Sequence, residues 1–146
     1  MRNVLIEDAL ANPLLFPLGW KVKTVDIENW MVSQSLELPA ELIEIWSSIG
    51  GGDFLESETL LVPNQSTFTD EIESIEATTS FLVENGFQKE FFVIHKGCVV
   101  SAVKQGTQSI FVFSADNYVS VCIYDSFENW YKTEFRDQFG TKYGLK

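Results

Sequence analysis

Four short runs of β-branched and aromatic residues, separated by brief turn sequences, constrain the fold of this chain more than any other feature. The runs are Phe91–Ile94, Val99–Val103, Ile110–Phe113 and Val119–Ile123. The segments between them carry Gly, Asn or Asp, which are typical of turns. Because connections this short join antiparallel neighbours, the second half of the chain is predicted to form an antiparallel strand meander.

Apolar spacing predicts about four helices around this sheet. The expected helices are Asp26–Ser35, a second that begins at Leu38–Pro39 and ends before Gly50–Gly51–Gly52, Thr69–Asn85, and a closing helix from about Asp125 to Phe135. A further strand is expected over Phe54–Pro63. This order predicts one α+β domain over residues 1–146, with a twisted antiparallel sheet covered by helices.

The first 24 residues contain Pro13, Pro17 and Gly19, which predict an extended apolar segment packed onto the body. Glu7 and Asp8 stand where a signal peptide would be apolar, so we expect a cytoplasmic protein. No apolar run approaches the roughly 20 residues of a membrane span. We expect a monomer or weak homodimer, with an exposed aromatic patch at Leu14–Trp20 as the candidate dimer contact.

The charge of the chain is distributed unevenly. The formal net charge is −11, and the stretch from Thr24 to Gln88 holds 13 acidic residues and no Lys or Arg. Phosphate backbones are bound by basic side chains, so this composition disfavours direct nucleic-acid binding. Two interpretations remain open: a solvated surface that aids solubility, or a negative face that meets a basic partner.

No residue pattern indicates a cofactor, a metal site or a complete catalytic set. His95 is the sole histidine, and it is expected in a hairpin turn beside a buried structural Cys98; a disulfide between Cys98 and Cys122 is not expected. One histidine and two cysteines fit zinc poorly. Gly50–Gly51–Gly52 ends a helix and lacks a following Lys-Ser/Thr, so it is not a phosphate loop.

A short region in the first half carries a family resemblance. LELPAELIEIWSSIGGGDF, at Leu36–Phe54, resembles the signature of the SUKH superfamily, which includes yeast cell-wall-synthesis regulators and many bacterial immunity proteins. The family pattern is Leu-Pro, a short helix and an Asn-Gly-Gly-like turn. Leu38–Pro39 and the three glycines match, whereas the Asn is replaced by Gly50 or lost. FFVIHKG at Phe91–Gly97 and DSFENWYKTEF at Asp125–Phe135 extend the resemblance to roughly Val25–Phe135.

The resemblance implies a non-catalytic binding domain without a cofactor. Bacterial members of the superfamily are commonly immunity proteins that bind and neutralise a cognate toxin, often a nuclease with a basic substrate groove. An acidic protein is suited to such a groove. The expected partner-binding residues lie around the glycine turn, the first strand and the third helix; they are Asp53, Glu56, Glu58, Asp70, Glu71, Glu73 and Glu76.

Two other functions stay open from the sequence. One is an intracellular regulatory or scaffold domain of the cell-wall-regulator type. The other is a small hydrolase that uses a carboxylate pair such as Asp53 and Glu56, since glycosidases use two carboxylates at a fixed separation.

Overall fold

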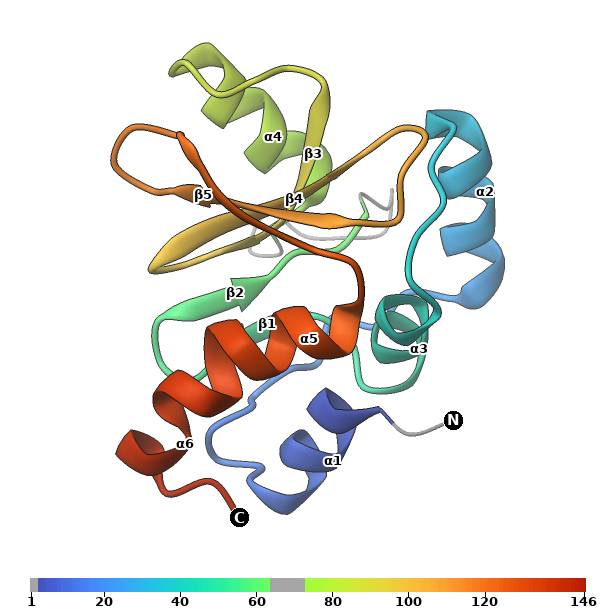
Figure 1. Cartoon of the computed structure of the whole chain (residues 1–146). Coiled ribbons are helices and arrows are strands. Elements are labelled where there is room, and N and C mark those ends of the chain that lie inside the picture. Colours follow the sequence, from blue (N-terminus) through green and yellow to red (C-terminus); the bar gives the residue numbers. More distant parts are fainter. Residues whose placement is uncertain (1–2, 64–72) are drawn as a thin grey trace.

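Six strands pair in chain order, β1-β2-β3-β4-β5-β6, and every neighbouring pair is antiparallel in the residues described by this computed structural model, 3–63 and 73–146 (Figure 1). The predicted α+β class and the meander are confirmed. The strands are β1 (Gly52–Phe54), β2 (Glu58–Leu60), β3 (Phe91–Lys96), β4 (Val99–Lys104), β5 (Ile110–Ser114) and β6 (Ser120–Tyr124).

The predicted single strand over Phe54–Pro63 is wrong, because the chain reverses there. β1 and β2 form a hairpin in which Phe54 pairs with Glu58, and the turn places Leu55 and Glu56 at φ of 48° and 65°. Left-handed backbone is usually occupied by glycine or asparagine. Leu55 and Glu56 are neither, so no sequence signal indicated a turn at this point. Leu55 is held there because its side chain is buried and its N–H donates to the carbonyl of Leu15 at 2.7 Å.

Helices occupy both ends of the chain and its middle. They are α1 (Val4–Ala11), α2 (Thr24–Gln34), α3 (Ala40–Ser48), α4 (Ile75–Glu84), and a closing helix made of α5 (Phe127–Tyr131), the π-helical turn η1 (Lys132–Arg136) and α6 (Asp137–Tyr143). The closing helix therefore extends beyond the predicted end at Phe135. The predicted start of α4, at Thr69, lies outside the described residues, but Ser74 is extended and caps the helix, so α4 begins later than predicted. None of the described helices has the length and apolar character that crossing a bilayer requires.

The expectation that the N-terminus is extended throughout is wrong for its first part. Val4–Ala11 is helical, and the Asn3 side chain caps it by accepting a hydrogen bond from the N–H of Ile6. Val4, Leu5 and Ala9 are buried along one side of this helix. Helix spacing in these residues outweighs Pro13, which acts only after the helix has ended.

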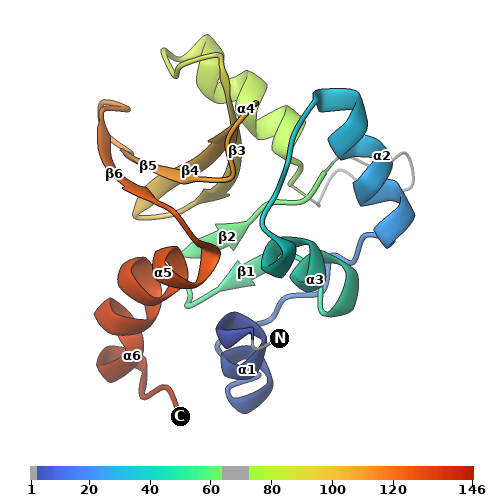
Figure 2. The same ribbon diagram turned by 45° about the vertical axis from the view of Figure 1, so that its right-hand side comes forward.

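Helix α3 lies between α2 and α5 (Figure 2), and a tryptophan from each of these helices reaches the sheet or the segment that follows β2. Trp30 of α2 lies edge-on to Phe92 of β3, and Trp130 of α5 donates to Ser101 of β4. Trp46 of α3 donates to the carbonyl of Leu61 at 2.9 Å. All three are buried.

The glycine run lets two chain segments approach closely beside β1. A Cβ on Gly51 would lie 2.6 Å from Cγ1 of Val62 and 2.7 Å from the carbonyl oxygen of Leu60. Gly50 has a φ of +91°, which also favours glycine. As a result, Trp20 forms a β-bridge with Gly51 along the outer side of β1.

Candidate functional site

A buried polar network lies between the sheet and the closing helix, with His95 at its centre. His95 Nε2 is 2.8 Å from Oε1 of Glu58, and Nδ1 is 2.9 Å from Oγ of Ser101. Trp130 Nε1 donates to the same Ser101 oxygen at 3.0 Å. We assign the imidazole proton to Nε2, because the Glu58 carboxylate can only accept; the Ser101 hydroxyl then donates to Nδ1, and each of these groups has a partner.

The Glu58 carboxylate is held by two turns of the sheet. Its Oε2 accepts from the Ser57 hydroxyl at 2.8 Å and from the N–H of Cys98 at 3.3 Å. Burial raises the pKa of Glu58, but the hydrogen bond and electrostatic attraction of the His95 N–H, with the bonds from Ser57 and Cys98, leave the pKa below its ordinary value. Gly97 makes room for this carboxylate, because a Cβ there would lie 2.1 Å from Oε1.

Aromatic rings enclose the imidazole of His95. The ring centroids of Phe135, Trp130 and Phe54 lie 4.9, 5.7 and 6.2 Å from that of His95. Phe135 comes from the π-helical turn η1 and is 1% exposed. The ring cage excludes water, so the hydrogen bonds of His95 lie in a low-dielectric interior.

The order Ser101–His95–Glu58 has the connectivity of a nucleophile, a base and an orienting acid, but its burial does not suit catalysis. Both Ser101 and His95 are 0% exposed, so a substrate has no access to the serine hydroxyl. The Ser101 oxygen is also occupied by the indole N–H of Trp130. The arrangement links the β1–β2 hairpin, β3, β4 and α5, and its role is structural.

A second buried carboxylate joins the two ends of the chain. Asp8 of α1 accepts from the hydroxyl of Tyr131 at 2.6 Å and forms an ion pair with Arg136. Burial and the contact with Asp8 raise the pKa of Tyr131 far above its ordinary range. This contact fixes α1 against the closing helix.

The predicted acidic residues of the β1–β2 hairpin separate into surface and interior positions. Asp53 and Glu56 are exposed, and Asp53 accepts from the hydroxyl of Thr59 at 2.9 Å. Glu58 is 1% exposed, so it is not available at the surface as the expected partner-binding role requires. The hairpin turn between Glu56 and Glu58 reverses the chain and directs Glu58 to the core.

The remaining predicted acidic residues lie near the start of α4. Glu73 forms an ion pair with Lys96 at 2.8 Å, and Glu76 is half-buried in the first turn of the helix. Asp70 and Glu71 fall outside the described residues. The positive charge of Lys96 therefore reduces the negative potential that Glu73 offers to a partner.

His95 and Cys98 occupy the reverse of their expected environments. The histidine, expected in a turn, is a buried residue of β3, whereas Cys98 is exposed in the turn that follows. Burial and the nearby Glu58 carboxylate raise the pKa of the Cys98 thiol, which disfavours the nucleophilic thiolate. Cys98 and Cys122 are free thiols. In the described part of the chain, no three His, Cys, Asp or Glu side chains are grouped to hold a metal ion.

The segment expected to expose an aromatic patch for dimerisation is partly buried. Phe16 is 5% exposed and stacks on Phe54 with 5.9 Å between ring centroids, and Trp20 is half-buried. Leu14 is the large hydrophobic side chain that this segment exposes, at 95%. The aromatic rings of this segment therefore contribute to the core, and the predicted patch is reduced to Leu14.

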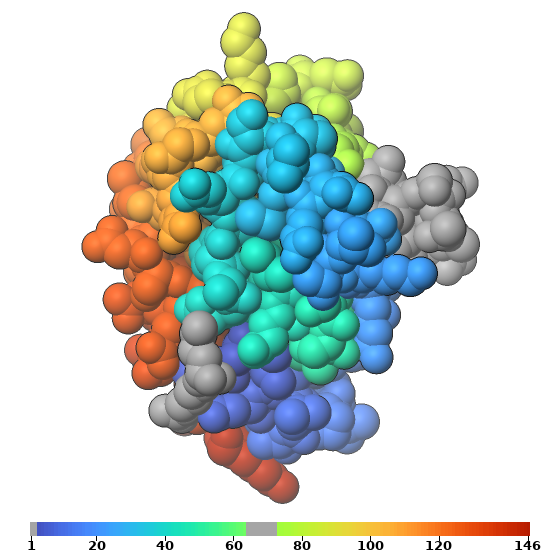
Figure 3. Space-filling view, turned by 90° about the vertical axis from the view of Figure 1, so that its right-hand side faces the viewer, coloured from blue at the N-terminus to red at the C-terminus, as the bar shows by residue number. Residues whose placement is uncertain are grey.

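Helices α2 and α3 and the segment between them form another face of the molecule (Figure 3), and this face carries acidic side chains outside the predicted binding set. Glu28, Glu37 and Glu44 are exposed, and Glu41 is half-buried. Within the described residues, no Lys or Arg side chain forms an ion pair with these four carboxylates. The signal for this face was present in the base-free stretch, but helical spacing alone does not say which acidic residues remain unpaired.

No family model, curated protein or solved structure matches the chain.

Proposed function

We propose that this chain is a non-catalytic immunity-type protein that acts inside the cell by binding a cognate toxin with a basic surface. The observation that carries this proposal is the set of carboxylates on α2, α3 and the segment between them that have no basic partner among the described residues, together with exposed Asp53 and Glu56 on the β1–β2 hairpin. The SUKH-like sequence pattern at Leu36–Phe54 supports the same class of function.

Unpaired surface carboxylates serve a binding protein in two ways. They accelerate association with a basic partner, by about 10- to 1000-fold for strongly steered pairs. They also repel anionic competitors such as nucleic acid, so a nuclease whose active site binds phosphates is a suitable target. Because the Debye length is about 8 Å at physiological salt, the carboxylates nearest the contact contribute most.

Co-expression with the protein encoded by the neighbouring gene tests the proposal, which requires that protein to be a toxin. We expect growth to be restored by this chain and the two proteins to purify as a complex. Restored growth without a complex, or a toxin that stays active when the chain is in excess, would contradict the proposal. A complex with a cell-wall regulatory protein in place of a toxin would favour the scaffold alternative.

A further inference from the structure

Helix α2 carries two apolar stripes, and only one of them faces the core. Ile27 and Trp30 are buried. On the outer side, Val25 is 56% exposed and Val32 is 81% exposed. Together with Glu28 they occupy positions i, i+3 and i+7, which share one face of a helix. The outer stripe therefore alternates apolar and acidic side chains.

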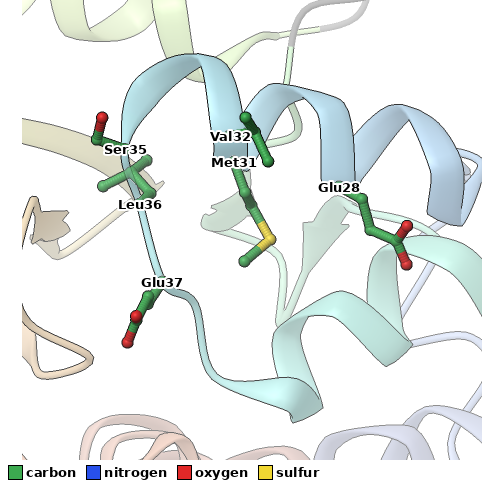
Figure 4. A pocket seen from close by; sticks show the side chains of 6 residues that line it. All are labelled: Glu28, Met31, Val32, Ser35, Leu36 and Glu37. Carbon is green, nitrogen blue, oxygen red and sulfur yellow. The ribbon is translucent and has the colours of Figure 1, made fainter.

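A groove of about 430 Å³ runs beside this stripe, between α2 and the segment that leads to α3. Figure 4 shows the Met31 side chain pointing into the space below α2, with the carboxylates of Glu28 and Glu37 on either side of it. The groove is lined by Glu28, Met31, Val32, Ser35, Leu36 and Glu37. Its floor is thus apolar and its margins are acidic.

The charges around the groove determine what can cover it. Glu28 and Glu37 have no ion-pair partner among the described residues, and the neighbouring side chain of Gln108, which lies 3.4 Å from Glu37 Oε2, is neutral. A purely apolar partner would bury these carboxylates without compensation, at a high cost in free energy. A basic segment without apolar groups would leave Met31 and Val32 in water.

We propose that this groove is the docking site for a basic amphipathic helix of the partner protein. The apolar stripe of that helix would cover Met31 and Val32, and Lys or Arg side chains beside the stripe would pair with Glu28 and Glu37. Laying an amphipathic helix into an apolar groove is a common mode of recognition. This inference rests on the proposed function and names the surface through which the toxin is bound; it moves the principal contact from the β1–β2 hairpin to α2.

A fluorescein-labelled helical peptide of leucine and lysine, arranged as an amphipathic helix, tests the inference directly. Its dissociation constant for the full chain is measured by fluorescence anisotropy at low salt. We expect Val32→Ser, and separately the double variant Glu28→Gln/Glu37→Gln, each to weaken binding by about tenfold, which corresponds to about 1.4 kcal/mol. A matched peptide with Glu in place of Lys should not bind.

Matched control variants distinguish binding in this groove from nonspecific attraction of a basic peptide to a negatively charged protein. The double variant Glu84→Gln/Asp116→Asn removes two exposed carboxylates at the end of α4 and in the β5–β6 turn, and Val121→Ser removes an exposed valine from β6. Both should leave the peptide affinity within twofold of the wild type. Equal losses in control and groove variants, unchanged affinity in either groove variant, or no binding to the wild type would overturn the inference. Thermal unfolding of each variant verifies that it is folded.

The groove variants also separate this inference from the proposed function. If they neutralise the toxin as well as the wild type does, the groove is not the contact and the immunity function stands. If the peptide binds the groove but the chain leaves the toxin active, the docking site stands and the immunity function is wrong.

Discussion

His95 Nε2 lies 2.8 Å from Oε1 of Glu58 in the interior of the protein, although 37 positions separate the two residues in the chain. The contact closes the β1–β2 hairpin onto β3, and Ser101 and Trp130 extend it to β4 and α5. Because α3 contacts both α2 and α5, this network supports the surface to which the binding function is assigned.

Replacing Glu58 should destabilise the fold strongly. In Glu58→Ala the imidazole N–H of His95, the hydroxyl of Ser57 and the N–H of Cys98 lose their shared acceptor, which should lower the free energy of unfolding by about 3 kcal/mol. Urea denaturation measures this change. Glu56→Ala is the matched control, since Glu56 is exposed in the same turn, and its effect should stay within about 0.5 kcal/mol. Equal effects of the two substitutions would contradict the role given to Glu58.

Stability should fall in acid partly through Glu58. The folded-state pKa of Glu58 lies below its ordinary value of 4.5, so its carboxylate stabilises the fold above pH 4.5, and this contribution is lost as the pH falls through the folded-state pKa. The free energy of unfolding, measured from pH 7 downward, should therefore decline less steeply in Glu58→Gln than in the wild type. Glu84→Gln, at an exposed site, should keep the wild-type slope, and the idea fails if Glu58→Gln keeps it too.

Gly97 should tolerate no side chain, because the Glu58 carboxylate fills the space where a Cβ would be. Gly97→Ala must displace Glu58 from His95, and we expect a loss of about 1–3 kcal/mol in the free energy of unfolding. Gly19→Ala provides the comparison, since a Cβ at Gly19 would meet no atom within 4 Å. Thermal and urea unfolding should show the loss for Gly97→Ala alone; similar curves for both variants would count against the packing argument.

The hydroxyl of Tyr131 should contribute to the attachment of α1. Tyr131→Phe removes a hydrogen bond at 2.6 Å to the buried carboxylate of Asp8 and leaves that carboxylate with Arg136. We expect a loss of about 1–3 kcal/mol and faster amide exchange in Val4–Ala11. Tyr143→Phe, on the half-exposed side of α6, should change neither; unchanged exchange in Tyr131→Phe would show that the bond does not hold the helix.

The elements that the sequence predicted well are those in which local pattern and tertiary packing agree. The strand meander follows from β-branched runs between turn residues, and α2 and α3 follow from apolar spacing and from the glycines after Ile49. The β1–β2 hairpin was missed because Leu55 and Glu56 adopt a backbone conformation that their residue types disfavour, and only burial of Leu55 maintains it. No local pattern records such a long-range cause.

The same limit applies to the candidate site. The base-free stretch from Thr24 to Gln88 indicated an acidic surface, but charge alone cannot distinguish buried Glu58 from exposed Glu56. Whether an acidic side chain is exposed or already paired, as Glu73 is with Lys96, depends on contacts across the fold. The exposure of Val32 was equally unpredictable from the sequence, because the buried apolar stripe of α2 is complete without this residue.

Recognition of another protein through the negative potential of this chain is tested most directly by association kinetics. The association rate constant with the toxin identified by co-expression should be measured by stopped-flow fluorescence at low and at high salt, while the activity of the toxin is followed. We predict a fall of about tenfold or more in the rate constant as salt increases, with a toxin that is inactive in the complex. A rate constant that is independent of salt, or a bound toxin that remains active, would contradict the account.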